Sequence, residues 1–212
     1  SEVNNYDIEN KYAPEKTSVS VTKAWSDSND QDGVRPNDIR VYLVADNEQT
    51  EKSIVLSEGN NWSGEFTDLE KYKDKKEIRY TVKEEAVDKY DTVVTGTAER
   101  GFTIENSHTP EKTAVAGSKT WSDRGDNDGK RPESITVRLH KDGQEIASKT
   151  VTEKDNWSWE FTGLDKYRDK GTEVVYTITE DAVDGYTSEV NNYDIENKYA
   201  PEKTSVSVTK AW

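Results

Sequence analysis

The chain has no cysteine and no methionine among its 212 residues, and it has only two histidines. The lack of cysteine excludes disulfide bonds and thiolate metal sites, and two histidines leave little room for histidine-based metal or catalytic chemistry. Apolar residues make up 31% of the chain, and no run approaches the roughly 20 apolar residues that a transmembrane helix needs. We therefore expect no metal site, no cofactor and no membrane span.

Charge is abundant but unbalanced, with 34% charged residues and a formal net charge of −14. An acidic surface repels phosphate, so no nucleic-acid partner is expected. This composition by itself is typical of disordered chains. The periodicity described below predicts instead a folded protein with a small core, and such cores usually need a crosslink or another added source of stability. Neither a signal peptide nor an initiating methionine is present, so we expect an internal fragment of a longer protein.

The first 25 residues, SEVNNYDIENKYAPEKTSVSVTKAW, recur letter for letter at residues 188–212. Such identity indicates a window cut from a tandem array. In this interpretation, residues 1–14 are the orphan last strand of a preceding repeat. Residues 202–212 are the orphan first strand of the next repeat.

A looser repeat divides the sequence between these ends. VTKAWSDSNDQDGVRP (21–36) matches GSKTWSDRGDNDGKRP (117–132), and EFTDLEKYKDK matches EFTGLDKYRDK further along. The short charged segments HTPEKT and YAPEKT follow the two copies, and proline makes them semi-rigid linkers. We therefore predict two homologous domains, residues 15–110 and 111–201.

Apolar residues alternate with period two between the turn signals, which is typical of half-buried strands. In the first domain the predicted inward rows are Val19, Val21, Lys23 and Trp25; Ile78, Tyr80, Val82 and Glu84; and Phe102, Ile104 and Asn106. Short strands at this spacing, without helical periodicity, predict an all-β sandwich in each domain.

Each inward row of the first domain carries one polar residue, namely Lys23, Glu84 and Asn106. The corresponding rows of the second domain carry Lys119, Glu180 and Asn197. A single lysine near a strand end most often extends to solvent at the sheet edge. The recurrence of all three residue types in both domains indicates instead that they meet in the core.

A lysine, a glutamate and an asparagine in contact inside a core can react. A buried charged pair is costly, and burial favours the neutral amine and the neutral carboxylic acid. The amine can attack the carboxamide carbon while the acid hydrogen-bonds the carbonyl and shuttles protons, with loss of ammonia. Fixed orientation contributes about 7–11 kcal/mol in the best cases, and donation to the developing oxyanion adds to it. The predicted product is a Lys–Asn isopeptide bond formed once, so no turnover enzyme is expected.

The order of motifs resembles the CnaB family, the B-type repeats of Gram-positive collagen adhesins. The motifs are VTKAW or GSKTW, then DxDGxRP, then YTVKE or YTITE, and a closing IEN. The resemblance implies two tandem transthyretin-like (prealbumin-like, inverse immunoglobulin) β-sandwich domains. It implies crosslinks that join Lys23 to Asn106 and Lys119 to Asn197, promoted by Glu84 and Glu180.

The same resemblance implies a structural role in a cell-wall-anchored adhesin or pilin on the extracellular surface of a Gram-positive bacterium. The chain would be a stalk or spacer segment. Its expected partners are adjacent repeats of the same array, with a host extracellular-matrix ligand engaged by other parts of the parent protein.

The duplicated ends leave two unmatched residues. Asn10 matches the asparagine of a domain whose lysine and glutamate are absent, and Lys210 matches a lysine with no glutamate or asparagine downstream. We expect neither to form a bond within the chain. A swap of residues 1–12 for 188–199 of another copy would join Asn10 to Lys119, but the resident strand is tethered at high effective concentration and should win.

The aspartate-rich loops suggest calcium, but the EF-hand pattern fails. Placing the loop glycine at the sixth position puts Ser28 and Arg124 first and Ile39 and Ile135 last, where carboxylates are required. Turns built on Asx side chains explain these loops better, and weak surface cation binding stays open.

The aromatic residues Trp157, Trp159 and Phe161 share one parity of a predicted strand. They either fill the sandwich or form a sugar-stacking platform, and core filling is favoured. The alternative function is therefore a host-protein or glycan binding module that uses its loops or the face of Trp159.

Overall fold

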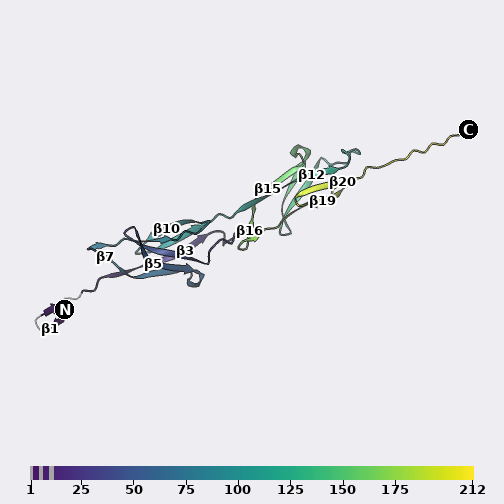
Figure 1. Cartoon of the computed structure of the whole chain (residues 1–212). Helices are drawn as coiled ribbons and strands as arrows, with labels where there is room; N and C mark the ends of the chain where they lie inside the picture. The colour runs from purple at the N-terminus through teal and green to yellow at the C-terminus, as the bar shows by residue number, and fades with distance from the viewer. Residues whose placement is uncertain (1, 5–6, 10–11) are drawn as a thin grey trace. The chain divides into compact units, whose positions relative to one another are not determined.

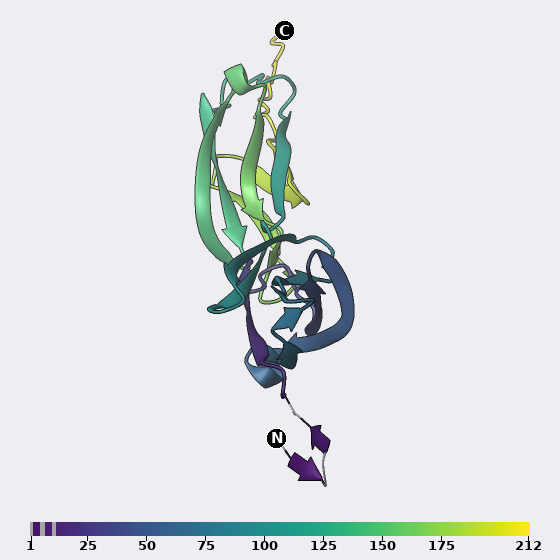
Figure 2. The same ribbon diagram turned by 90° about the vertical axis from the view of Figure 1, so that its left-hand side faces the viewer.

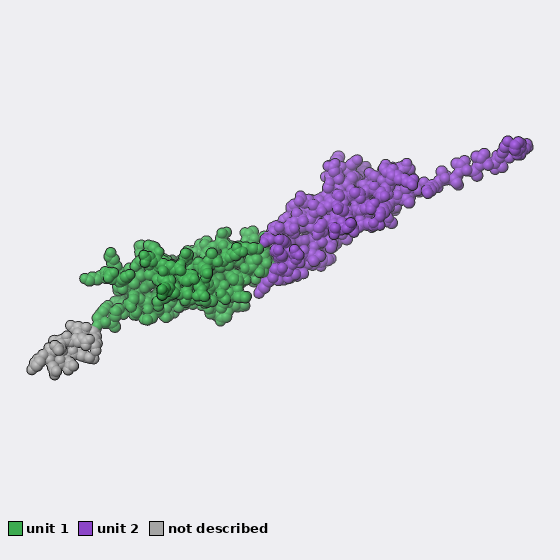
Figure 3. Space-filling model, viewed as in Figure 1, with its two compact units in different colours: residues 1–110 green, residues 111–212 purple. Residues whose placement is uncertain are grey.

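The computed structural model describes residues 2–4, 7–9 and 12–212. The chain divides into two compact units, Ser1–Pro110 and Glu111–Trp212 (Figure 3). Within the described residues the regular structure consists of strands and two short 3-10 helices, as expected for an all-β protein. No helix in this part of the chain is long and apolar enough to cross a membrane.

Unit 1 contains a sandwich of one four-stranded and one three-stranded sheet (Figure 1). The four-stranded sheet has the order β10 (Asp91–Thr97), β11 (Gly101–Ser107), β3 (Lys16–Ser26) and β6 (Ser63–Glu70). The three-stranded sheet has the order β5 (Glu48–Ser57), β4 (Asp38–Ala45) and β9 (Tyr80–Glu84). The short 3-10 helix η1 (Glu58–Asn60) joins β5 to β6. Two ribbons complete the unit, β1 (Glu2–Asn4) with β2 (Asp7–Glu9), and β7 (Tyr72–Lys73) with β8 (Lys76–Glu77).

Unit 2 repeats this arrangement, and Figure 2 shows its strands from a second side. Its four-stranded sheet has the order β15 (Ser158–Asp165), β12 (Lys112–Ser122), β20 (Asp194–Lys198) and β19 (Thr187–Asn191). Its three-stranded sheet has the order β14 (Gln144–Thr152), β13 (Ser134–Lys141) and β18 (Tyr176–Glu180). The 3-10 helix η2 (Glu153–Asp155) corresponds to η1, and the ribbon of β16 (Tyr167–Arg168) and β17 (Thr172–Glu173) corresponds to β7–β8.

The core of each unit lies between its two sheets and is supplied by alternating strand residues, which in unit 1 include apolar members of the predicted rows on β3, β9 and β11. In unit 1 the four-stranded sheet contributes Val19, Val21, Phe66, Leu69, Phe102 and Ile104, and the three-stranded sheet contributes Ile39, Val41, Leu43, Leu56 and Val82. Burial of one face of each strand by the facing sheet is the main stabilising contribution to such a sandwich. The prediction of two all-β sandwiches is confirmed.

The first and last strands of each sandwich lie side by side and run parallel. In unit 1, Lys23 of β3 is paired with Ile104 of β11, and Trp25 is paired with Asn106. In unit 2, β12 and β20 pair in the same register, with Lys119 opposite Ile195. Parallel neighbours need a long crossover connection, and here the rest of the sandwich is that connection.

The two cores differ at one cross-strand pair, because the larger residue lies on the first strand in unit 1 and on the opposite strand in unit 2. In unit 1 the large residue is on the first strand, where Val21 faces Gly64. In unit 2 Gly117 faces Trp159. A Cβ on Gly117 would lie 1.7 Å from the carbonyl oxygen of Tyr193, so this strand must carry glycine while the tryptophan opposite fills the space.

Candidate functional site

The three polar residues of the inward rows meet in the core of unit 1. Lys23 comes from β3 and Asn106 from the adjacent strand β11, while Glu84 comes from β9 of the facing sheet. Lys23 Nζ lies 3.4 Å from Glu84 Oε1, and these two side chains are 0% and 1% exposed. Asn106 is fully buried. The alternation of the strands therefore places an amine, a carboxyl group and a carboxamide in one dry site.

Unit 2 builds the same site from β12, β18 and β20. Lys119 Nζ donates a hydrogen bond to Glu180 Oε1 at 2.5 Å, and both side chains are buried. Asn197 is fully buried on β20, the parallel neighbour of β12. The structure thus pairs each lysine with its glutamate and buries each asparagine on the strand next to that of the lysine, while the covalent bonds themselves stay a prediction.

Both asparagines have unpaired amide groups. Neither Nδ2 nor Oδ1 of Asn106 has a hydrogen-bond partner, and the same holds for Asn197. A buried polar atom without a partner costs about 1–3 kcal/mol, and most buried polar groups in folded proteins are satisfied. Two fully buried carboxamides left unpaired at equivalent positions indicate a role other than hydrogen bonding.

Burial also prepares the lysines as nucleophiles. Desolvation lowers the pKa of Lys23 to about 8, although the nearby Glu84 carboxylate opposes this change. Desolvation likewise lowers the pKa of Lys119, against the opposing effect of the hydrogen bond that Lys119 donates to Glu180. For Lys23 the change raises the neutral fraction of the amine at neutral pH by roughly two orders of magnitude.

An aromatic cluster closes the end of the sandwich next to the lysine. In unit 1, Lys23 Nζ lies 4.2 Å from the centroid of the Trp25 ring. Trp62 and Tyr90 pack edge-on against Trp25 at 5.2 and 5.1 Å, and the Arg35 guanidinium lies over the same ring at 5.2 Å. Trp121, Trp157, Tyr186 and Arg131 form the equivalent cluster in unit 2. These rings shield the amine from water, a function that the sequence reasoning missed.

The aspartate-rich loop of unit 1 is held against this cluster by its own side chains. Arg35 donates two hydrogen bonds to the buried Asp27 carboxylate, at 2.9 and 2.6 Å, and Tyr90 donates a third at 2.8 Å. The backbone N–H of Asp30 also donates to Asp27. The interpretation as Asx-based turns is confirmed. Among the described residues no group of acidic or histidine side chains is arranged to hold a metal ion.

The repeated spacing of SD and RP in both copies is the signal that could have revealed this arrangement. In unit 2, Arg131 forms the same two hydrogen bonds with Asp123. The guanidinium of Arg131 lowers the pKa of Asp123 to about 2. The loop therefore stays locked over the aromatic cluster throughout the neutral and mildly acidic range.

The aromatic platform considered from the sequence does not exist. Trp159 is 5% exposed, Phe161 is also buried, and Trp157 packs against the core of unit 2. The interpretation as core residues is confirmed, and the interpretation of Trp159 as a sugar-stacking surface is wrong, because its ring fills the space above Gly117.

The unmatched residue at the carboxyl end lies apart from any site. Residues 200–212 form no strand, and Lys210 and Trp212 are exposed. Asn10 lies outside the described residues.

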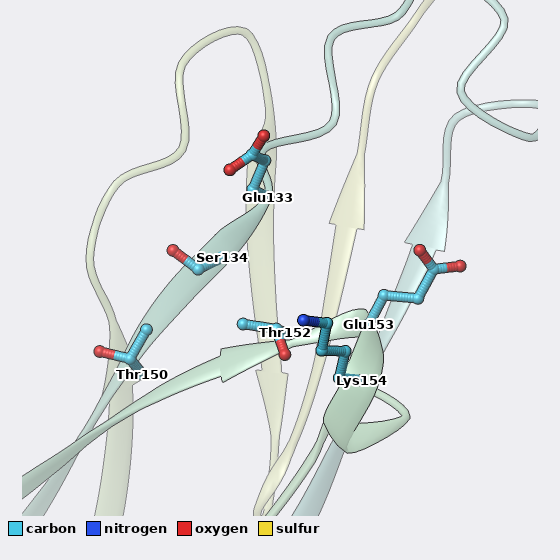
Figure 4. A pocket seen from close by; sticks show the side chains of 6 residues that line it. All are labelled: Glu133, Ser134, Thr150, Thr152, Glu153 and Lys154. Carbon is cyan, nitrogen blue, oxygen red and sulfur yellow. The ribbon is translucent and has the colours of Figure 1, made fainter.

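A surface hollow of about 500 Å³ in unit 2 lies at the ends of β13 and β14 and beside η2 (Figure 4). It is lined by Glu133, Ser134, Thr150, Thr152, Glu153 and Lys154. Ligand sites are usually apolar with a few convergent polar groups, whereas every one of these side chains is polar or charged. The hollow contains none of the reactive residues described above.

The fold and the buried sites define a class of all-β repeat protein in which one sandwich module, with the same internal trio, recurs along the chain. Residues 19–107 and 115–198 match the Cna protein B-type domain. The chain belongs to this family, which consists of adhesin repeat domains and not of enzymes.

Two known proteins illustrate the relationship. The chain is 42% identical over its full length to a collagen adhesin of Staphylococcus aureus, and it spans 18% of the length of that relative. It is also similar to the crystal structure of two B repeat units of the collagen binding protein of Staphylococcus aureus. That similarity has a TM-score of 0.78 and 41% identity, and it covers 94% of this chain and 54% of the other.

Proposed function

We propose that the chain is a structural spacer in which each module, residues 15–110 and 111–201, is locked by a self-formed isopeptide bond. The bonds would join Lys23 to Asn106 and Lys119 to Asn197. The observation that carries the proposal is the fully buried asparagine with both amide atoms unpaired, set beside a buried lysine whose pKa is lowered. Bond formation would remove the amide NH₂ group that the core leaves unsatisfied.

The reaction balances within the site. The neutral lysine Nζ attacks Cγ of the asparagine, a new C–N bond forms, and the bond from Cγ to Nδ2 breaks. The glutamate, as the neutral carboxylic acid, donates a hydrogen bond to the carbonyl oxygen as negative charge develops there, and it carries a proton from Nζ to the leaving nitrogen. The products are a secondary amide and one ammonia molecule, so the overall step needs no cofactor or oxidant.

The pairing of the first and last strands gives the bond a mechanical consequence. Tension enters a module at the start of β3 and leaves at the end of β11, and these parallel neighbours would slide past each other in shear. A bond from Lys23 to Asn106 carries the load directly between the strands and bypasses residues 24–105. The module then resists extension even though its core is thin.

The setting follows from the relatives. The similar protein from Staphylococcus aureus is a collagen adhesin, and a spacer of this kind would hold an adhesive region away from the wall of a Gram-positive cell. We propose an extracellular, cell-wall-anchored location for the parent protein. Adjacent repeats would be the partners of this chain, and a host matrix ligand would be bound by other parts of the parent protein.

Intact mass measured under denaturing conditions tests the proposal. The chain should be lighter than its sequence mass by two molecules of ammonia, and peptide mapping should find the branched peptides that contain Lys23 and Lys119. Glu84→Gln and Glu180→Gln should each restore one ammonia. Glu85→Gln is the matched control, because Glu85 is exposed and faces away from the core. A wild-type chain of full sequence mass would refute the proposal.

A further inference from the structure

The two reactive sites differ in the contacts of the lysine and of the glutamate. Lys23 Nζ donates hydrogen bonds to the carbonyl oxygens of Ala24 and Ile104, whereas Lys119 Nζ donates to Glu180. In unit 1 the Thr92 hydroxyl donates a hydrogen bond to Glu84 Oε2 at 2.9 Å, and Glu84 Oε1 stays 3.4 Å from Lys23 Nζ. In unit 2 the corresponding oxygen, Oε2 of Glu180, has no hydrogen-bond partner, and the Lys–Glu contact closes to 2.5 Å. The same trio is therefore held in two different arrangements.

Thr92 owes this contact to its place in the β10–β11 hairpin. It lies directly opposite Asn106 in the antiparallel ladder, and directly opposed residues share a face of the sheet. Its side chain therefore points with Asn106 toward β9, where Glu84 is located. Ser188 occupies the equivalent position opposite Asn197.

A carboxylate that binds a lysine ammonium closely keeps the proton on the amine, and a protonated amine is no nucleophile. A hydroxyl that holds the other oxygen limits how far the carboxylate can close on the lysine. It also fixes the carboxyl group beside the carboxamide that it must assist, and such preorganisation raises the rate of an intramolecular reaction.

We propose that Thr92 is a positioning residue for crosslinking in unit 1: its hydroxyl holds Glu84 beside Asn106 and back from Lys23, so that this bond forms faster than the bond in unit 2. The proposal rests on the isopeptide function proposed above. It adds that the isopeptide bonds of the two modules form at different rates, and that the Thr92 hydroxyl sets this difference.

The other charges around Lys23 do not change with Thr92. Glu84 faces the amine from β9, Glu105 acts on it from β11, and Asp27 acts from the loop after β3. The last two are the same in every variant below. A comparison of unit 1 with and without the Thr92 hydroxyl therefore isolates the effect of the carboxyl position.

The test is a time course of bond formation in the full chain. The chain is made by cell-free synthesis, quenched in denaturant at intervals and digested, and the branched peptide of each module is quantified by mass spectrometry. Thr92→Val, which keeps the β-branched shape, should slow crosslinking in unit 1 about tenfold, the factor of one hydrogen bond to a charged group. Ser188→Ala should leave unit 2 unchanged, because Oε2 of Glu180 has no hydrogen-bond partner for Ser188 to supply.

The pH profile separates positioning from a merely structural role. In Thr92→Val the rise of the unit 1 rate with pH should move to higher pH, because the closer carboxylate holds the proton on Lys23, whereas the unit 2 profile in the same molecules should not move. Equal unit 1 rates in the wild type and Thr92→Val, or an unmoved profile, would overturn the proposal. So would equal slowing of unit 2 by Ser188→Ala.

Two controls keep the outcome clear. Resistance of unit 1 to brief proteolysis reports whether Thr92→Val has folded. A wild-type chain that never loses ammonia refutes the isopeptide function itself, while one that loses two molecules of ammonia at rates independent of Thr92 refutes only the positioning role.

Discussion

Replacement of Glu84 by glutamine should remove the bond in unit 1 while preserving the shape of the buried side chain. An amide cannot shuttle the proton from Lys23 to the leaving nitrogen, so the module would fold without its crosslink. The bond would close a loop of about 80 residues, and by the chain-entropy relation for disulfides such a closure stabilises the fold by about 4.5 kcal/mol. Loss of the carboxylate partner of a buried lysine adds to this, so the figure is a lower bound.

Scanning calorimetry of the intact chain measures the effect. For a domain of this size, a loss of about 4.5 kcal/mol lowers the midpoint of thermal unfolding by at least about 20 °C. Unit 2 keeps its own trio and provides an internal reference in the same scan. Glu85→Gln is the external control, since the exposed Glu85 makes only a long ion pair with Arg40 at 3.8 Å.

Two results would contradict this reasoning. If Glu84→Gln still loses two molecules of ammonia, the glutamate is not needed for the reaction. If the variant keeps the mass of one extra ammonia but unit 1 unfolds within about 5 °C of the wild type, loop closure does not stabilise the module as calculated.

Three further predictions concern packing and pH. Gly117→Val should destabilise unit 2 by about 3 kcal/mol or more, because its Cβ meets the Tyr193 carbonyl oxygen; an unchanged unit 2 transition in calorimetry would contradict this. The hydrogen bond to Asp32 raises the pKa of His108, so its stabilisation is complete below the ordinary histidine value of about 6.5 and is lost as pH rises through the raised folded value. The unit 1 midpoint should therefore fall over that range, and His108→Tyr should abolish the dependence. Asp123, with a pKa lowered to about 2, stabilises unit 2 above its ordinary pKa and loses this as pH falls toward 2, so Asp123→Asn should flatten the acid limb of a unit 2 stability curve.

Most of the fold and of the buried site could be predicted from the alternation of apolar residues along the strands. Because side chains on a strand alternate strictly between faces, finding Lys23, Glu84 and Asn106 on apolar parities sufficed to place them in the core, where the structure has them. The resemblance to a known family added which lysine is expected to be joined to which asparagine. The copy of the same pattern in unit 2 made chance an inadequate explanation.

Contacts that depend on tertiary geometry escaped this reasoning. Thr92 lies on an edge strand that is exposed along its length, and no local pattern distinguishes a threonine that reaches Glu84 from one that faces water. The hydrogen bonds from Arg35 to Asp27 span a loop whose path is set by its turn conformation. Such contacts follow from the sheet register and loop geometry, which a period-two pattern does not specify.

Comparison of the duplicated segments shows which strand pairings form between close neighbours in sequence and which strands form only within a complete sandwich. In the hairpin of β1 and β2, Val3 faces Ile8, and the identical residues of β19 and β20 pair in the same register. Close neighbours in sequence can form this pairing without the rest of a module. The identical segments at residues 15–25 and 202–212 behave differently, because the first forms most of β3 between β6 and β11, and the second forms no strand.

The reactivity of the lysine also depends on a complete sandwich. Lys23 is buried with a lowered pKa, whereas Lys210, in the same sequence context, is exposed. The amine becomes a nucleophile only when strands on both sides and a facing sheet exclude water, so no segment of this sequence is reactive before its module has closed. In the proposed reaction, completion of the fold is thus the step that would permit crosslinking, and a lysine in an unfinished module should stay chemically ordinary until the remaining strands pair with it.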